Sequence, residues 1–174
     1  MLDLVGIYMA VAVKSSLVDK VKNIETMIVR TGFLGSMGNK GSVFFRFTYL
    51  KKSIAIACGH FCAGNTNAST RVTELGDVMN KCFKGYNQKI REHDLYFIFG
   101  DLNFRMDLAY DETIALIKLK KLDKLYNYDQ FHKAKESNSL FFDLEEGKIA
   151  FPPTYKYDQK TNEYSEKKKK IPSW

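Results

Sequence analysis

The fold of this chain depends most on one stretch, Leu95-Tyr96-Phe97-Ile98-Phe99-Gly100-Asp101-Leu102-Asn103-Phe104-Arg105, in which an apolar run leads directly into polar side chains. Five apolar or aromatic residues followed by a glycine predict a strand buried on both faces. If the strand continues, Asp101 and Asn103 share one face, and Gly100 permits close approach or an unusual backbone angle. The stretch therefore predicts a functional site at the end of a rigid strand. The alternative is an ordinary strand followed by a turn, and other segments must decide between the two.

The composition is that of a globular protein with one domain. A chain of 174 residues can bury a sizeable core, and its 45% hydrophobic and 14% aromatic residues argue against disorder. The sequence contains no window of about 18 uninterrupted apolar residues, the pattern of a membrane span. The apolar stretch at residues 2–13 is predicted as a strand, with bounds at residues 5–13, rather than as a signal peptide, so we expect a cytoplasmic protein. The three cysteines, Cys58, Cys62 and Cys82, predict neither a disulfide framework nor a zinc site.

The net charge of +7, from 27 Lys and Arg against 20 Asp and Glu, favours a polyanionic partner. Nucleic acid, phosphoinositide membranes and soluble polyphosphates all fit this charge. Part of the excess lies in the lysine run at residues 167–170, which is either a binding element or a solvated loop.

A glycine-rich segment, residues 31–41, contains four glycines in eleven residues and precedes a predicted strand at residues 43–49. Its spacing suits close approach of the backbone to a ligand. It is not a P-loop, because Lys40 is followed by Gly41 rather than Ser or Thr, and a strand rather than a helix comes next.

A second buried strand is predicted over residues 53–61, and it ends at His60. A histidine there is either a functional group or a structural residue bonded to nearby backbone. Helical spacing follows over residues 70–83, and a further helix is predicted from a cap at Asp111. Two prolines, at 152 and 153, stiffen the segment before Tyr155 and Lys156. Strands and helices alternate, and the early strands lack helical crossovers, so the class is α/β with a mixed sheet.

Four patterns in this chain, taken in order, resemble the inositol polyphosphate 5-phosphatases, a family within the superfamily of magnesium-dependent endonucleases, exonucleases and phosphatases. They are Thr31-Gly32-Phe33-Leu34-Gly35-Ser36-Met37-Gly38-Asn39-Lys40-Gly41, Gly59-His60-Phe61-Cys62-Ala63-Gly64, Gly100-Asp101-Leu102-Asn103-Phe104-Arg105 and Phe151-Pro152-Pro153-Thr154-Tyr155-Lys156-Tyr157-Asp158. The third is shared across the superfamily, whereas the first and fourth are specific to the 5-phosphatases. The resemblance covers essentially the whole chain. It implies an α/β fold of two packed mixed β-sheets flanked by helices, a four-layer sandwich.

The resemblance also implies hydrolysis of the 5-phosphate of phosphatidylinositol phosphates or inositol polyphosphates, by in-line attack of water with Mg²⁺ as Lewis acid. Asp101 is the implied base, Asn103 a donor to the scissile phosphate, and His60 a phosphate ligand or proton donor. The implied substrate-binding residues are Asn39 and Lys40 for the phosphate that joins ring to lipid, Arg105 for orientation, and Tyr155, Lys156 and a lysine among Lys167, Lys168 and Lys170 for a neighbouring ring phosphate.

By the same resemblance, residues 1–174 are the central part of one catalytic domain, truncated at both ends. The family's metal-binding glutamate is expected before Val5, and its Cys-Asp-Arg and Ser-Asp-His motifs after Trp174, so no metal ligand is assigned here. Ser173 and Lys170 stand where the family has alanine and arginine. We therefore expect the fold and substrate class of the family, but no activity from this chain alone.

Two other functions are open from the sequence. Gly100-Asp101-Leu102-Asn103 and the basic charge also suit a superfamily nuclease acting on DNA, although Pro152-Pro153-Thr154-Tyr155-Lys156 favours the phosphatase. The third possibility is a non-catalytic truncated homologue that binds anionic lipid. For the phosphatase we expect phosphoinositide lipids or soluble inositol polyphosphates as partners, peripheral contact with anionic membranes at their cytosolic face, no nucleic acid, and a monomer.

Overall fold

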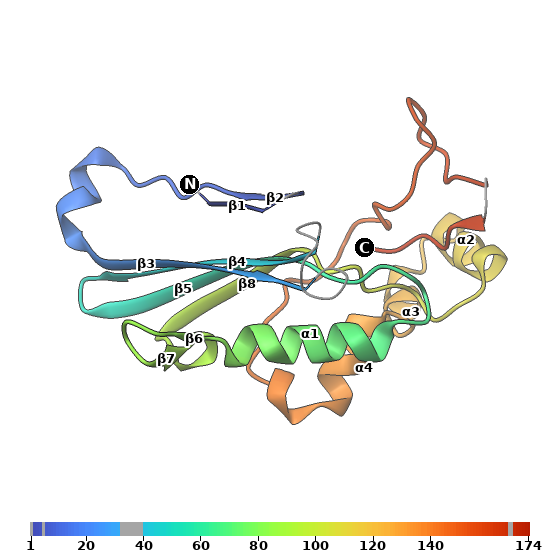
Figure 1. Cartoon of the computed structure of the whole chain (residues 1–174). Helices are drawn as coiled ribbons and strands as arrows, with labels where there is room; N and C mark the ends of the chain where they lie inside the picture. The colour runs from blue at the N-terminus through green and yellow to red at the C-terminus, as the bar shows by residue number, and fades with distance from the viewer. Residues whose placement is uncertain (1, 5, 32–39, 167–168) are drawn as a thin grey trace. The chain divides into compact units, whose positions relative to one another are not determined.

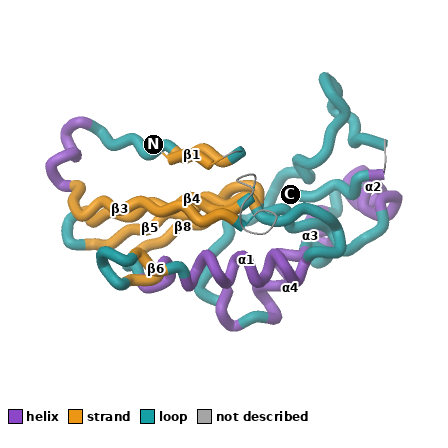
Figure 2. Tube along the Cα trace, viewed as in Figure 1, coloured by secondary structure: helices purple, strands orange, loops and turns teal. Residues whose placement is uncertain are grey.

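The computed structural model describes residues 2–4, 6–31, 40–166 and 169–174. They form two compact units (Figures 1 and 2). Unit 1 comprises Met1–Ala63 and Ser69–Asn103 and contains the described strands, whereas unit 2 comprises Gly64–Ala68 and Phe104–Trp174 and is built from helices and loops.

Unit 1 is organised around a four-stranded mixed sheet in the order β3-β4-β5-β8. Strands β3 (Val21–Arg30), β4 (Gly41–Tyr49) and β5 (Lys52–His60) run antiparallel to their neighbours, and β8 (Leu95–Asp101) adds parallel to β5. A parallel pair needs a long crossover connection, and this one includes helix α1 (Ala68–Asn80). The predicted α/β class with a mixed sheet is confirmed.

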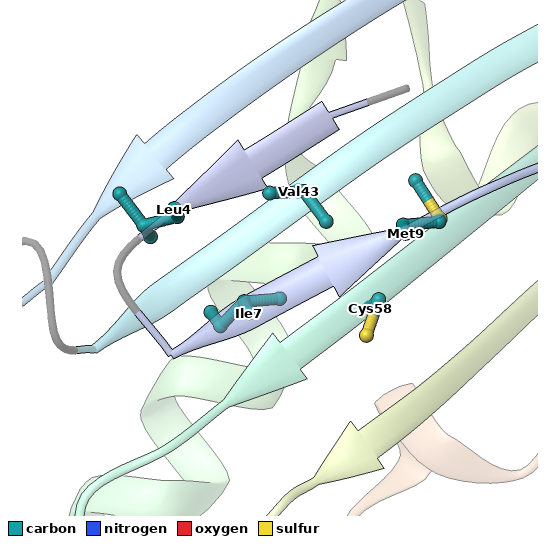
Figure 3. Packing of buried hydrophobic residues seen from close by; sticks show 5 residues of the cluster. All are labelled: Leu4, Ile7, Met9, Val43 and Cys58. Atoms are coloured by element: carbon teal, nitrogen blue, oxygen red, sulfur yellow. The ribbon is translucent and has the colours of Figure 1, made fainter.

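A small antiparallel sheet packs on one face of the larger sheet (Figure 1). Its strands are β1 (Leu2–Leu4) and β2 (Ile7–Met9), and Gly6 between them has φ +82°, which favours glycine. Residues 5–13 therefore do not form the single strand that we predicted. Figure 3 shows the buried cluster that joins the two sheets, which comprises Leu4, Ile7 and Met9 of the hairpin and Val43 and Cys58 of β4 and β5.

The opposite face of the larger sheet is covered by α1 and by the short strands β6 (Cys82–Phe83) and β7 (Gln88–Lys89) (Figure 1). Successive strand residues point to opposite faces, so Phe44 turns away from the hairpin while its neighbour Val43 faces it. Phe44 and Val78 of α1 are both buried and line one cavity. The predicted helix over residues 70–83 is confirmed as far as Asn80.

Strand β8 is not buried on both faces, and this part of our prediction is wrong. Leu95, Phe97 and Phe99 are 53%, 53% and 49% exposed. The parallel register with β5 places them on the same face as Ile54, Ile56 and Cys58. The buried cluster beneath the hairpin, together with the partly buried side chains around it, draws on β3, β4 and β5, and β8 lies at the sheet edge beyond them.

Unit 2 contains α2 (Tyr110–Lys118), α3 (Leu122–Tyr126) and α4 (Gln130–Ser137). The predicted helix from residue 111 is interrupted after α2, where Lys120 has φ +54°. Asp111 is not its cap, because Ala109 occupies the N-cap position and Asp111 lies in the first turn. Of the short 3-10 helices, η1 (Ser15–Lys20) and η3 (Ile90–Glu92) belong to unit 1, and η4 (Ser139–Phe141) belongs to unit 2.

A buried histidine lies just before β8. The Nδ1 atom of His93 is 2.8 Å from the carbonyl oxygen of Lys89, so Nδ1 must carry the hydrogen. Its Nε2 atom then accepts a hydrogen bond from Nε of Arg46 at 3.2 Å. Burial lowers the pKa of His93, and the adjacent Arg46 guanidinium adds to that effect. The network therefore requires a neutral imidazole.

We predict that His93 makes the protein less stable in mild acid. A histidine whose pKa is lowered in the folded state binds its proton more readily in the unfolded chain. Its contribution to the stability of the fold is therefore present above the ordinary pKa of 6.5 and is lost as the pH falls below that value. The free energy of unfolding, measured in urea at pH 8 and at about pH 5.5, should be smaller at the lower pH.

The control for this prediction is the His93→Gln variant, in which the pH-dependent part of the difference should shrink. His93→Gln must be compared with wild type at both values of pH, because other groups also titrate. Burial lowers the pKa of His60, which acts in the same direction, and raises the pKa of Asp129 to about 6, which acts in the opposite direction. An unchanged pH dependence in His93→Gln would contradict the prediction.

Candidate active site

The candidate site of unit 1 begins where β5 and β8 end side by side. In the parallel register His60 pairs with Asp101, so both side chains emerge at the carboxyl-terminal edge of the sheet. Nε2 of His60 lies 3.5 Å from Oδ2 of Asp101, and the two side chains are 27% and 65% exposed. The structure thus brings together two residues that lie 41 positions apart in the sequence, and it leaves the carboxylate accessible to solvent.

Asn103 joins this pair through a turn rather than through a continued strand. Strand β8 ends at Asp101, and Asn103 has φ +57°, a left-handed conformation that asparagine tolerates well. Its main-chain N–H donates to Oδ1 of Asp101 at 3.2 Å, and its buried side-chain Nδ2 donates to the carbonyl of Phe61 at 3.0 Å. Our expectation that Asp101 and Asn103 share a strand face was wrong, but the turn still holds the two residues together.

Lys40 lies against His60, with 2.5 Å between Nζ and Nε2. An ammonium group can only donate, so this contact makes Nε2 an acceptor and the imidazole neutral. Burial lowers the pKa of His60 and the charge of Lys40 lowers it further, while the carboxylates of Asp101 and Glu74 act in the opposite direction. The site therefore combines a carboxylate, a neutral imidazole and an ammonium group.

Two glycines allow the strand ends to approach each other. Gly59 and Gly100 are direct partners in the β5–β8 ladder. A Cβ atom on Gly100 would lie 2.2 Å from the carbonyl oxygen of Gly59, and Gly100 has φ +120°. The predicted special role of Gly100 is confirmed in both respects, close approach and unusual backbone angle.

Unit 2 brings together two of the predicted substrate-binding residues. The guanidinium carbon of Arg105 lies 4.3 Å from the centroid of the Tyr155 ring, a cation–π arrangement. The main-chain N–H of Arg105 donates to Oε1 of Gln130 at 3.0 Å, which fixes the segment after the turn. Lys156 and Lys170 are exposed. Asn39, Lys167 and Lys168 lie outside the described residues.

The sequence did not reveal the side chains that hold the segment after His60. Arg71 and Glu74 of α1 contact the main chain of Cys62 through Nη1 and Oε2, at 3.1 and 2.9 Å. Their spacing of three residues places them on one helix face, but that signal is common in surface helices and did not single them out.

Among the residues that the structure describes, no group of three or more His, Cys, Asp or Glu side chains forms a metal site. Asp101 offers a carboxylate and Asn103 an amide oxygen, which are ligand types that Mg²⁺ accepts. A hard cation is held firmly only by more oxygen ligands than these. The described residues do not by themselves make a magnesium site.

The mixed sheet carries a polar group of Lys40, His60, Asp101 and Asn103 at its edge, and comparison with known proteins shows the family. Residues 1–174 match the model of Endonuclease/Exonuclease/phosphatase family 2, and the chain belongs to this family.

Two curated relatives show where within the family the similarity lies. Synaptojanin-2 of Rattus norvegicus is 34% identical over 173 residues, covering 99% of this chain and 12% of the relative. Inositol-1,4,5-trisphosphate 5-phosphatase 1 of Schizosaccharomyces pombe is 34% identical over 173 residues, covering 99% of this chain and 16% of the relative. The chain thus spans 12% and 16% of the lengths of these proteins.

The fold matches a solved structure of the inositol polyphosphate 5-phosphatase domain of SPsynaptojanin in complex with inositol (1,4)-bisphosphate and calcium ion. The TM-score is 0.80 at 34% identity, and the match covers 91% of this chain and 46% of that chain. The resemblance to the inositol polyphosphate 5-phosphatases is therefore confirmed. That residues 1–174 are the central part of one catalytic domain stays a prediction.

Proposed function

We propose that the protein removes the 5-phosphate of phosphatidylinositol phosphates or inositol polyphosphates by in-line attack of water, with Mg²⁺ as cofactor. The observation that carries this proposal is the meeting of His60, Asp101 and Asn103 at the ends of paired strands. The relatives named as 5-phosphatases, and the solved domain bound to inositol bisphosphate, give the substrate class.

In this proposal Asp101 is the base that orients or deprotonates the attacking water. Its carboxylate is held on one side by the N–H of Asn103 and approached on the other by His60, yet stays open to solvent. Positive charge is needed beside the phosphate oxygens in the transition state, and Lys40 brings an ammonium group to this point. With its Nε2 accepting from Lys40, neutral His60 has no proton to give from that nitrogen, and only its Nδ1–H is left to donate a hydrogen bond to the phosphate.

The remaining residues are proposed to bind the rest of the substrate. Arg105 and Tyr155 hold each other in unit 2, so the Tyr155 ring has a fixed orientation. The further proposed contacts are the exposed lysines Lys156 and Lys170, a lysine of Lys167 and Lys168, and Asn39 together with Lys40.

The proposal is tested by incubating the full-length protein with phosphatidylinositol 4,5-bisphosphate vesicles and Mg²⁺, and measuring released phosphate. We expect release that stops with a chelator and returns when Mg²⁺ is added back. Soluble inositol 1,4,5-trisphosphate in a parallel reaction separates a preference for lipid from one for the free headgroup. Nicking of plasmid DNA without phosphate release would indicate a nuclease, and vesicle binding without either reaction a non-catalytic homologue.

We predict that the 174-residue chain alone releases no phosphate under these conditions. The described residues do not make a complete magnesium site, and Leu95, Phe97 and Phe99 expose apolar surface on β8. The isolated chain should also bind an apolar fluorescent dye strongly, because exposed apolar faces do so. Magnesium-dependent release by the purified chain that disappears in Asp101→Asn would contradict this prediction.

A location at the cytosolic face of anionic membranes is part of the proposal. It is supported by the net charge of +7, since basic surfaces are attracted to anionic lipid. Sedimentation with vesicles of anionic and of neutral lipid tests the contact, and analytical ultracentrifugation tests the proposed monomer. None of the helices among the described residues has the length and apolar character needed to cross a bilayer.

A further inference from the structure

Both main-chain groups of Cys62 are bonded by side chains of α1. Oε2 of Glu74 accepts a hydrogen bond from the N–H of Cys62 at 2.9 Å, and Nη1 of Arg71 donates to its carbonyl at 3.1 Å. The side chain of Arg71 is fully buried. Burying a guanidinium is costly unless its hydrogen bonds are made inside the protein. Arg71 makes one such bond to the Cys62 carbonyl. We call Arg71 and Glu74 the Cys62 clamp.

The clamped segment touches the candidate active site at three points. It begins directly after His60, whose side chain faces Lys40 and Asp101. The N–H of Phe61 donates to the main-chain carbonyl of Asp101 at 3.0 Å, and the carbonyl of Phe61 accepts from Nδ2 of Asn103 at 3.0 Å. A shift of this segment would therefore be passed to His60, Asp101 and Asn103.

Glu74 also holds a second segment of the site. Its Oε1 accepts from the hydroxyl of Thr31 at 3.4 Å, and the N–H of Thr31 donates to the carbonyl of Lys40 at 3.0 Å. One carboxylate thus connects the backbone that follows His60 with the backbone paired to Lys40. The side chains of His60 and Lys40 are in contact with each other at the site.

We propose that Arg71 and Glu74 are positioning residues, which act through the backbone of Cys62 to keep His60, Asp101 and Asn103 in their working arrangement. This inference rests on the proposed function for its effect on turnover, but not for the geometry that it describes. Neither residue is assigned contact with the substrate.

The helix itself is held by other residues, so loss of the clamp need not unfold it. Leu75, Val78 and Met79 of α1 are buried, and this apolar contact is independent of the Glu74 carboxylate. Removing Glu74 should release the segment while leaving α1 in place. A misplacement of about 1 Å at a reacting group can cost up to about 10²-fold in rate, so a small release is enough to be measured.

The test compares three variants of the full-length protein. Glu74→Ala removes the hydrogen bonds, Glu74→Gln keeps an oxygen that can accept from Cys62, and Asp77→Ala removes an exposed carboxylate one turn further along the same helix. We expect Glu74→Ala to lower kcat about 10-fold with KM within about threefold, Glu74→Gln to recover most of the loss, and Asp77→Ala to match wild type. The order of the variants by melting temperature should differ from their order by kcat.

Two NMR measurements separate this inference from the proposed function. Exchange of the Cys62 amide hydrogen with solvent should be faster in Glu74→Ala and near wild type in Glu74→Gln. The negative charge of Glu74 raises the pKa of His60, so the titration of the His60 ring should move to lower pH in both Glu74 variants, because both remove that charge.

Each outcome decides one of the two ideas. If wild type releases no phosphate, the proposed function fails, and the exchange of the Cys62 amide still tests the clamp. If Glu74→Ala keeps wild-type turnover and wild-type amide exchange, or if Glu74→Gln is as impaired as Glu74→Ala, the clamp is wrong. As a second variant, Arg71→Lys keeps the charge and loses the planar donor, and it should lower kcat in the same direction.

Discussion

Replacing Asp101 by asparagine in the full-length protein should lower kcat by at least about 10²-fold and leave KM within about threefold, the scale expected when a positioned base is lost. Asparagine has the same shape and can still accept from the N–H of Asn103, so the turn should survive. What it cannot do is take up a proton from water. Since the side chain is 65% exposed, its replacement should cost little stability.

The matched control is Asp94, which directly precedes the other end of β8. Asp94 accepts hydrogen bonds from Nζ of Lys52 and from the N–H and hydroxyl of Ser53, all at 2.8 Å. The bond from Lys52 and those from Ser53 hold the pKa of Asp94 well below its usual range. Asp94→Asn should therefore lower the melting temperature without a large change in kcat. If Asp101→Asn instead loses folding, as judged by a circular dichroism melt, Asp101 is structural and not the base.

The sequence predicted the strands better than their surroundings. Aromatic and β-branched residues located β4 correctly, and a buried apolar run located β5, because these strands carry their own local pattern. The same reasoning failed for β8, whose apolar run predicted burial on both faces, although Phe97 and Phe99 are about half exposed. Whether an apolar strand is covered depends on which elements reach it, and the local sequence does not contain that information.

The candidate site shows a similar division. His60 and Asp101 were predicted because each ends an apolar strand, and the parallel register brings them together. The link to Asn103 was predicted for the wrong reason, since a left-handed turn rather than a strand face provides it. The contact of Lys40 with His60, and the bonds of Arg71 and Glu74 to Cys62, join segments far apart along the chain. Such contacts follow from tertiary packing and have no local sequence signal.

A large effect on folding is expected from Gly100→Ala. The new Cβ atom would lie 2.2 Å from the carbonyl oxygen and 2.9 Å from the nitrogen of Gly59, and both of these are main-chain atoms. A flexible side chain could move aside, but a paired strand cannot do so without breaking its ladder. The φ angle of +120° adds strain for any residue with a Cβ. We expect a loss of about 3 kcal/mol or more in the free energy of unfolding.

Gly147→Ala is the control, because nothing lies within 4 Å of a Cβ atom at that position. Urea unfolding of the two variants should therefore give a large change for Gly100→Ala and a change near zero for Gly147→Ala. Any folded Gly100→Ala protein should also lose turnover, since separating Gly59 from Gly100 moves His60 away from Asp101, the next pair in the ladder. Wild-type stability in Gly100→Ala would mean that β5 and β8 do not pair as closely as described, and the proposed joint action of His60 and Asp101 would then lose its geometric basis.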